Sequence, residues 1–252
     1  LNFMKKILII TDAWEPQVNG VVTTMKSVVK KLKEKNFKVE VIHPGMFHTF
    51  PLPNYPEISV AWNFWDLKKK IEKFDADYMH ISVEGPLGVT GRHYCLENNI
   101  PYTTCIHTKF PEYVYERFGI GLDVTQGLLK WFHNPAAKTL VNTISHKEEL
   151  EQDGFTDLVL WSRGFDEKIF YPCPDGGKKK YLLYVGRVAV EKNIEEFLKM
   201  PSHLPKVVVG GGPSLKSYAK KYPDVEFVGF KKGKELADYY SCLLYTSDAA
   251  DE

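Results

Sequence analysis

Residue types suited to chemistry gather in four short segments, and each segment directly follows a run of residues typical of a buried β-strand. The first segment, residues 11–20 (TDAWEPQVNG), leads into an amphipathic helical pattern. Gly20 would let a ligand approach the backbone closely, and the free amide groups of a helix N-terminus favour an anion. The spacing alone is equally compatible with a loop that only caps the helix.

The second and third segments carry side chains that can form hydrogen bonds with hydroxyl groups. Residues 84–88 (EGPLG) form a turn that opens a helix, and Glu84 can accept hydrogen bonds from hydroxyl groups. A solvated carboxylate on a turn is the simpler interpretation. Residues 106–113 (IHTKFPEY) place His107 at the end of a strand, where an imidazole can exchange hydrogen bonds with a hydroxyl or a phosphate near neutral pH. A single histidine is, however, more often structural than catalytic.

The fourth segment, residues 186–193 (GRVAVEKN), has the features of a diphosphate site. Gly186 permits close approach, Arg187 supplies a planar and permanently charged fork, and Lys192 adds a point charge near a helix N-terminus. Two such contacts, at roughly 1.5–3 kcal/mol each, would matter for binding, whereas either cation alone would be interpreted as surface charge. Residues 210–213 (GGGP) indicate only a tight turn, because the sequence contains neither G-x-G-x-x-G nor the phosphate-loop motif.

The composition removes several other classes of function. The 252 residues carry 33 basic and 32 acidic side chains, and the resulting net charge of +1 argues against a non-specific nucleic-acid binder. Hydrophobic residues make up 44% and charged residues 26%, as in ordinary globular proteins. The apolar runs are too short to cross a bilayer or to form a secretory signal, so a cytoplasmic location is expected.

Neither a metal site nor a redox site is expected. The histidines that lie near strands and helices lack the short H-x-x-x-H spacing of metal ligands; they are His80, His107, His133 and His146. The four cysteines include no C-x-x-C pair, which favours buried and reduced thiols.

The elements that must position these segments alternate between short β-branched runs and amphipathic stretches, the pattern of βαβ units with a parallel sheet. Strands are expected at residues 5–10, 38–43, 76–81, 102–107, 139–143, 157–161, 181–185, 206–209 and 225–228. Helices are expected at residues 21–35, 145–152, 194–199, 215–221 and 234–240. Ser145 and Glu148 are expected to form a capping box at the start of the second helix.

Composition also suggests where the domains begin and end. Residues 170–180 are rich in proline, glycine and lysine, as in an exposed connection, so one domain is expected at residues 1–172 and a second at 173–241. A natural start is expected at Met4, with residues 1–3 as upstream translation. The last segment, 242–252 (CLLYTSDAADE), looks like the translation of a sequencing-library adapter, and a non-native tail on a fragment is therefore expected.

Together these segments resemble the family 4 retaining glycosyltransferases of GT-B fold, especially bacterial mannosyltransferase-like members. The resemblance extends from Met4 to Ser241, and the order and spacing of the pieces make it specific. The matching pieces are TDAWEPQVNGVVTT, VEGPLG, HTKFPEYV, WSRGFDEKIFYP, YVGRVAVEKNIEEFL, VVVGGGP and VEFVGF.

The resemblance implies an α/β fold with two Rossmann-like domains facing across a cleft, the first on the acceptor side and the second, incomplete, binding the nucleotide sugar. It implies transfer of a hexose, with mannose favoured, from a nucleotide diphosphate sugar to an acceptor hydroxyl with retention of the anomeric configuration. The donor is a substrate, so no cofactor and no metal are expected. A lipid or a glycan would serve as the acceptor.

The resemblance also implies roles for particular residues. Gly186, Arg187 and Lys192 match positions that hold the donor diphosphate, which Asn19 and Gly20 approach from the first domain. The position beside the transferring sugar, and the catalytic role, fall to His107. Glu84 and Thr108 would contact the acceptor. The family's glutamate-rich E-x7-E loop should follow Tyr240, where the suspect tail stands instead, so this fragment is expected to bind donor poorly and to be inactive.

Two other functions fit the same pattern. A GT-B nucleotide-sugar epimerase shares the fold and the phosphate contacts but needs no acceptor, and a non-catalytic glycan- or nucleotide-binding module needs no chemistry at all. A Rossmann dehydrogenase is disfavoured by the missing glycine fingerprint. Aromatic and basic residues mix at 62–73, which fits peripheral contact with the inner face of the membrane. Core packing beneath a lysine-covered outer face explains that stretch equally well.

Overall fold

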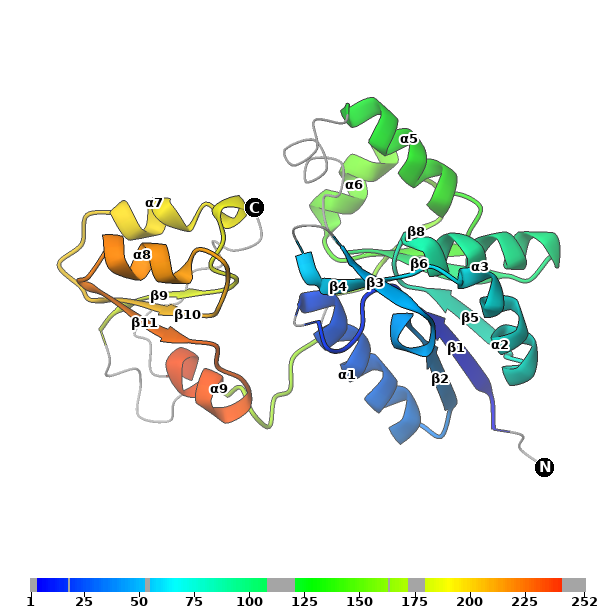
Figure 1. Ribbon diagram of the computed structural model, residues 1–252, viewed down its shortest axis with the longest axis horizontal. Coiled ribbons are helices and arrows are strands. Elements are labelled where there is room, and N and C mark those ends of the chain that lie inside the picture. The colour runs from blue at the N-terminus through cyan, green and yellow to red at the C-terminus, as the bar shows by residue number, and fades with distance from the viewer. Residues whose placement is uncertain are drawn as a thin grey trace. The chain divides into compact units, whose positions relative to one another are not determined.

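The computed structural model describes residues 4–17, 19–52, 55–107, 121–162, 164–171 and 180–241. The chain divides into two compact units, unit 1 (Leu1–Arg163) and unit 2 (Gly164–Glu252), which Figure 1 shows in blue to green and in yellow to red. Tyr171 belongs to unit 2, where its carbonyl accepts a hydrogen bond of 3.0 Å from the Ser241 hydroxyl. The division therefore lies earlier in the chain than residues 172 and 173, where composition places it.

The core of unit 1 is a six-stranded parallel sheet with the order β2-β1-β5-β6-β7-β8. Its short, β-branched strands are buried, as in sheets that helices cover on both faces. Their bounds are β1 (Lys6–Ile10), β2 (Lys38–Ile42), β5 (Tyr78–Ile81), β6 (Tyr102–Ile106), β7 (Lys138–Val141) and β8 (Leu158–Leu160). All six lie within one to two residues of a predicted strand, so the predicted parallel sheet of this unit is confirmed.

The helices of unit 1 are α1 (Gly20–Glu34), α2 (Leu67–Phe74), α3 (Pro86–Glu97), α5 (Leu122–His133) and α6 (Ile144–Gln152). Leu8 and Ile10 of β1 share a buried cluster with Leu67 of α2 and Leu87 of α3. Helix α1 buries Val22 and Met25. None of the helices in the described ranges combines the length and the apolar character that a membrane crossing requires.

One predicted cap is wrong. Helix α6 begins after Thr143, whose hydroxyl oxygen accepts a hydrogen bond of 3.2 Å from the His146 amide. Ser145 lies inside the first turn, so the predicted capping box of Ser145 and Glu148 does not form. Threonine caps a helix in the same way as serine, and the two candidates stand only two positions apart, which is why the pattern favoured the wrong one.

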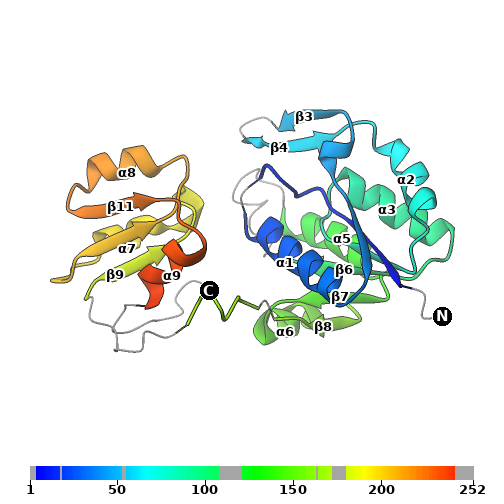
Figure 2. The same cartoon turned by 90° about the horizontal axis from the view of Figure 1, so that it is seen from below.

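An antiparallel hairpin that the sequence pattern did not predict also belongs to unit 1. Strands β3 (Thr49–Leu52) and β4 (Tyr55–Ala61) pair with each other and form a separate two-stranded sheet. Figure 2 shows this hairpin apart from the six-stranded sheet. The short 3-10 helices η1 (Pro44–Met46) and η2 (Phe64–Asp66) precede and follow it.

Unit 2 contains a three-stranded parallel sheet with the order β11-β10-β9. Its strands are β9 (Leu182–Val185), β10 (Lys206–Val209) and β11 (Val225–Gly229), and its helices are α7 (Ile194–Lys199), α8 (Leu215–Lys221) and α9 (Gly233–Ser241), with η3 (Val190–Lys192) before α7. A small core around Val188, Ile194 and Val208 holds the sheet against the helices. Every strand and helix predicted for this part of the chain is confirmed.

Candidate functional site

Three of the four candidate segments belong to unit 1, and the loops that carry them begin at one edge of its six-stranded sheet. Strands β1, β5 and β6 are neighbours, and they run parallel, so the residues that follow them emerge together at their carboxyl ends. Ser82 joins two of these loops directly, because its amide donates to the carbonyl of Ile10 over 2.8 Å. The sheet edge therefore brings together segments that are far apart in the sequence.

Asp12 fixes the loop after β1 to the helix after β5, a role that the sequence pattern did not single out. Its carboxylate accepts hydrogen bonds from the amides of Leu87 (3.0 Å) and Gly88 (2.9 Å), in the first turn of α3. A carboxylate at this place satisfies free amides and complements the helix dipole. The signal that could have revealed it is an aspartate directly after a buried strand, as in the TDAWEP stretch.

Burial raises the pKa of the Asp12 carboxyl to about 6. Removing a carboxylate from water disfavours its charged form, and this outweighs the amides of Leu87 and Gly88, which lower the pKa, while the nearby Glu84 adds to the rise. The carboxyl group that holds the start of α3 is therefore ionised at neutral pH and takes up a proton under mildly acidic conditions.

Glu84 lies in a chain of buried polar groups. Its Oε1 atom is 3.0 Å from Nε2 of His133, whose side chain is only 1% exposed. The other ring nitrogen of His133 is 2.9 Å from the hydroxyl of Thr104, which lies 2.9 Å from the hydroxyl of Thr139. Glu84 is thus neither the free hydroxyl acceptor nor the solvated turn carboxylate of the two sequence interpretations, because one of its oxygens is committed to His133.

His107 follows β6 directly and is half-buried at the same sheet edge. Its Nε2 atom lies 3.2 Å from the hydroxyl of Ser82, and its carbonyl accepts a hydrogen bond of 3.4 Å from the side-chain amide of Asn142. The Ser82 contact orients the imidazole, and the Asn142 contact holds the backbone of His107. Thr108, the other predicted acceptor contact in this segment, lies outside the described residues.

Asn19 caps helix α1. Its side-chain oxygen accepts a hydrogen bond of 3.0 Å from the amide of Val22, and its side-chain nitrogen donates to Gln17 over 3.2 Å. Gly20 is the first residue of the helix, and both Asn19 and Gly20 are exposed. The capping interpretation thus describes Asn19, and the exposed start of the helix still presents amides to which an anion could bind.

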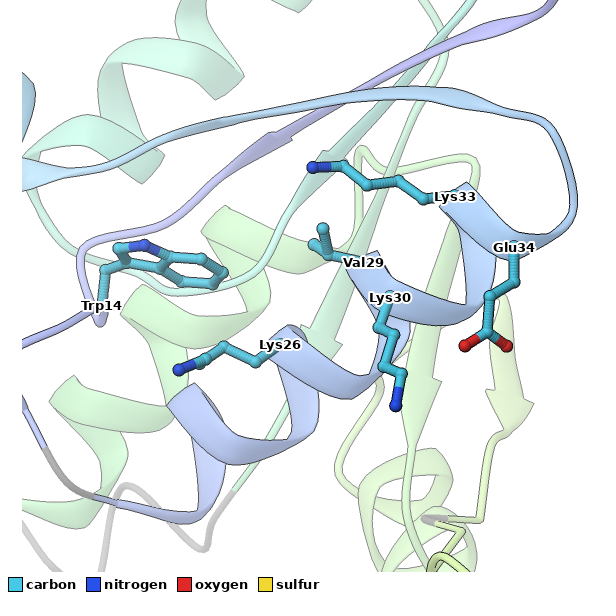
Figure 3. Close-up of a pocket in the computed structure, with 6 residues that line it drawn as sticks. All are labelled: Trp14, Lys26, Val29, Lys30, Lys33 and Glu34. Carbon is cyan, nitrogen blue, oxygen red and sulfur yellow. The ribbon is translucent and has the colours of Figure 1, made fainter.

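An open hollow of about 540 Å³ lies beside α1. Figure 3 shows the ring of Trp14 beside the helix, and the hollow is lined by Trp14, Lys26, Val29, Lys30, Lys33 and Glu34. None of the predicted site residues lines it. In the part of the chain that the structure describes, no three histidine, cysteine, aspartate or glutamate side chains gather in a way that would hold a metal ion.

In unit 2, the loop after β9 is held by the loop after β10. The Gly186 amide donates to Val209 over 3.0 Å, and the Val188 amide donates to Gly211 over 2.9 Å. Gly210 lies so close to the carbonyl of Gly186 that a Cβ atom on it would be 1.8 Å from that oxygen. This packing fixes the backbone of the GRVAVEKN segment.

The two predicted diphosphate cations lie on this fixed segment. Arg187 and Lys192 are both exposed, and Lys192 is the last residue of η3. The Tyr184 hydroxyl donates a hydrogen bond of 3.2 Å to the carbonyl of Arg187, which adds a further restraint on its backbone. The fixed loop therefore carries one guanidinium and one ammonium group near the carboxyl end of β9.

Replacing Asp12 with asparagine is expected to change how the stability of unit 1 depends on pH. Because the folded chain binds the Asp12 proton more tightly than the unfolded chain, this group stabilises the folded state increasingly as the pH falls from neutral. With a folded pKa of about 6, that gain is about 1 kcal/mol between pH 7 and pH 5. We expect the stability difference between the original chain and Asp12→Asn to grow by this amount, as measured by urea unfolding followed by tryptophan fluorescence.

The comparison must be made between the two proteins, because another buried group acts in the opposite direction. Burial, with a smaller contribution from His107, lowers the pKa of His80 to about 4. The stability that the neutral His80 contributes is therefore lost as the pH falls below the pKa of a free imidazole. Asp153→Asn, which removes an exposed carboxylate from the same unit, controls for the change in net charge. Parallel pH profiles for the original chain and Asp12→Asn would contradict the prediction.

Comparisons with known proteins agree with the fold and extend along most of the chain. The model of Glycosyltransferase Family 4 matches residues 18–168. The GDP-mannose-dependent alpha-mannosyltransferase of Corynebacterium glutamicum is 25% identical over 94% of this chain, and this chain spans 65% of that protein's length. The protein of the same name from Mycobacterium tuberculosis is also 25% identical, over 94% of this chain and 71% of its own length.

Among solved structures, the crystal structure of Anabaena HepE in complex with UDP has a TM-score of 0.60 at 14% identity, over 94% of this chain and 72% of that chain. At this identity the likeness concerns the fold alone. It confirms the α/β fold class of GT-B type that the sequence predicts.

Proposed function

The chain belongs to Glycosyltransferase Family 4, and we propose that the protein transfers a hexose from a nucleotide diphosphate sugar to a hydroxyl group, with retention of the anomeric configuration. Mannose is the sugar we propose first, because two relatives are named GDP-mannose-dependent alpha-mannosyltransferases. The acceptor hydroxyl belongs to a lipid or a glycan. The names of two further relatives, a sulfoquinovosyl transferase and an alpha-monoglucosyldiacylglycerol synthase, support glycosyl transfer more broadly.

The observation that carries this proposal is the fixed loop after β9. Two cations on a rigid backbone suit a diphosphate, and the departing nucleotide diphosphate gains negative charge as the glycosidic bond breaks. Arg187 and Lys192 would stabilise that charge more in the transition state than in the bound substrate, which is the condition for catalysis. We assign Gly186 the role of letting the diphosphate approach the backbone.

Roles for the residues of unit 1 follow from the sheet edge at which they lie. His107 is held by Ser82 and Asn142, and we place it beside the transferring sugar. Asn19 and Gly20 would present the start of α1 to the diphosphate. Glu84 would face the acceptor with the oxygen that His133 does not occupy, and Thr108 would contact the acceptor as well. The proposed transfer requires no metal, no enzymic nucleophile and no nucleic-acid partner.

Substituting Arg187 with alanine is expected to weaken binding of a nucleoside diphosphate by about 10- to 100-fold, the loss typical of one charge-assisted contact. Isothermal titration with GDP and with UDP measures the change. Lys220→Ala, which removes an exposed cation from α8 of the same unit, is the matched control and should leave the affinity unchanged. Equal affinity for the original chain and Arg187→Ala would contradict the diphosphate role.

The reaction itself is tested on the whole protein, because this fragment is expected to be inactive. The whole protein is incubated with GDP-mannose, with and without an acceptor such as diacylglycerol in mixed micelles or a soluble mannoside. A transferase releases GDP at a rate that rises with the acceptor, and the anomeric coupling of the product reports retention. An epimerase would convert the donor in the absence of an acceptor. A non-catalytic module would bind the nucleotide and leave the donor intact.

A further inference from the structure

His133 is a buried polar residue to which the proposed reaction assigns no role of its own. It is the last residue of α5, and its side chain is only 1% exposed. The rings of Phe132 and Phe155 lie near its ring, with centroids 4.9 and 6.4 Å away. A polar ring among apolar neighbours costs free energy unless its nitrogens are hydrogen-bonded, so the partners of this imidazole explain how it can be buried.

Both ring nitrogens of His133 have partners. Nδ1 lies 2.9 Å from the hydroxyl of Thr104 on β6, which lies 2.9 Å from the hydroxyl of Thr139 on β7. Both threonines are fully buried. Nε2 lies 3.0 Å from Oε1 of Glu84, and the ring nitrogen donates this hydrogen bond, because a carboxylate oxygen can only accept. A continuous set of contacts thus runs from two strands of the sheet, labelled in Figure 2, through α5 to a carboxylate at the sheet edge.

Glu84 is the exposed end of this set of contacts. Its side chain is 19% exposed, and within the part of the chain that the structure describes its only hydrogen-bond partner is His133. Glu84 lies just before α3, whose first amides are capped by Asp12. The backbone beside Glu84 and one of its carboxylate oxygens are therefore both fixed, which leaves the other oxygen, Oε2, in a defined place at the sheet edge.

We propose that His133 is a positioning residue for the acceptor, which holds Oε1 of Glu84 so that Oε2 accepts a hydrogen bond from the acceptor hydroxyl. This inference rests on the proposed function, in which Glu84 faces the acceptor. A glutamate that is held beforehand loses little rotamer freedom when the acceptor binds, so the contact gains affinity. An apolar side chain of similar volume at position 133 would fill the core without burying polar groups, so stability alone does not explain the histidine.

Two amide substitutions separate the two contacts of His133. A glutamine can place its amide nitrogen near the position of Nε2, whereas an asparagine, one carbon shorter, reaches only the position of Nδ1. His133→Gln therefore keeps a donor for Glu84, and His133→Asn keeps a partner for Thr104 but abandons Glu84. A merely structural role predicts similar behaviour for both variants, because both remove the ring.

The whole protein is assayed with GDP-mannose and with diacylglycerol in mixed micelles or a soluble mannoside as the acceptor. His133→Asn should raise the KM for the acceptor by about tenfold or more, the loss typical of a hydrogen bond to a charged group, with a smaller change in kcat. His133→Gln should stay within about threefold of the original protein. The affinity for GDP, measured by titration, should change by less than about twofold in both variants, because the proposed diphosphate contacts lie mainly in unit 2.

A double-mutant cycle tests whether His133 acts through Glu84. Glu84→Ala should itself raise the KM for the acceptor, and His133→Asn should then add less than about twofold in the Glu84→Ala background. The matched control is a second histidine–glutamate pair in the same unit, on the surface of α3. Nε2 of His93 lies 3.1 Å from Oε1 of Glu97, with the two side chains 69% and 60% exposed. His93→Asn should leave the KM for the acceptor unchanged.

Magnetic resonance on the 252-residue chain tests the contact without any reaction. The Nε2 proton of His133 should give an imidazole N–H signal that is protected from exchange with water and absent from His133→Asn. Glu84→Ala should lose this protection, because the proton then has no acceptor. A far-UV spectrum and a urea unfolding curve verify that each variant is folded, and the signal in Glu84→Ala tests the proposal even where a His133 variant does not fold.

The outcomes separate this proposal from the proposed function. Equal acceptor KM values for folded His133→Gln and His133→Asn, in a protein that transfers sugar, would overturn the positioning role and leave sugar transfer standing. Additive losses in the double-mutant cycle, or a protected signal that persists in Glu84→Ala, would overturn it as well. A whole protein that shows the protected signal but transfers no sugar would overturn the proposed function, and the positioning role would fall with it.

Discussion

Gly210→Ala should lower the free energy of unfolding of unit 2 by about 3 kcal/mol or more, because the site offers no room for a side chain. The residue has a φ of +147°, a conformation that side chains disfavour, and its Cβ atom would lie 1.8 Å from the carbonyl oxygen of Gly186. The carbonyl belongs to the backbone and the Cβ atom is bonded directly to it, so neither can rotate away, and the collision is relieved only if the loops after β9 and β10 separate. Hydrogen exchange at the amides of Gly186 and Val188, which join these loops, measures the effect.

The neighbouring glycine provides the matched control. No heavy atom outside its chain neighbours lies within 4 Å of a Cβ atom placed on Gly211, and its φ is not in the left-handed range. Gly211→Ala should therefore change the stability by less than about 1 kcal/mol. Tryptophan fluorescence adds an internal control, since all five tryptophans of the chain lie in unit 1 and its unfolding should be unaltered in both variants. Equal exchange rates in Gly210→Ala and Gly211→Ala would contradict the packing argument.

The same substitution tests the proposed diphosphate contact. If the loops after β9 and β10 separate, Arg187 moves with its backbone, so Gly210→Ala should also weaken binding of GDP and UDP. Gly211→Ala should keep the affinity of the original chain. A Gly210→Ala protein that loses stability but keeps its nucleotide affinity would still support the packing argument. It would contradict the proposal that Arg187 binds the diphosphate.

The parallel strands could be predicted because burial on both faces selects short β-branched runs between turns. The run at 206–209 (KVVV) was predicted at the very residues that form β10, and the run at 38–43 exceeded β2 by one residue. Neighbouring parallel strands end on the same side of a sheet, so Asp12, Glu84 and His107, which follow three such strands, lie at the same sheet edge. This is why the candidate segments of unit 1 could be predicted from the sequence.

The hairpin and the polar contacts could not be predicted in the same way. Strand β3 contains Pro51, which removes an amide donor, and proline in a run argues against a strand. An edge position in a two-stranded sheet tolerates it. The contact between Glu84 and His133 joins residues 49 positions apart, and it forms only because α5 packs against the sheet. Such a contact depends on the tertiary structure and leaves no local pattern.

Gly88→Ala is expected to destabilise unit 1 by about 3 kcal/mol or more, since it forces a methyl group into the backbone of the preceding turn. A Cβ atom at this position would lie 1.9 Å from the carbonyl oxygen of Val83. Gly88 is in the first turn of α3, and its amide donates to Asp12, so the start of the helix must shift or lose its cap. Urea unfolding followed by tryptophan fluorescence reports the loss, because the five tryptophans lie in this unit.

A second helical glycine in the same unit has the opposite expectation. Gly127 lies in α5, is exposed, and has no heavy atom within 4 Å of an added Cβ atom beyond its own helix and chain neighbours. Gly127→Ala should therefore stabilise the unit by about 0.5–1 kcal/mol, the gain in helix propensity. Opposite signs for the two variants would show that the approach of Val83 to Gly88, and not a general effect of the substitution, holds α3 in place. A shifted α3 also exposes Asp12 to water, so Gly88→Ala should lose the gain in stability that protonation of Asp12 gives between pH 7 and pH 5. A Gly88→Ala protein that keeps this gain would contradict the conclusion that Asp12 fixes the loop after β1 to α3.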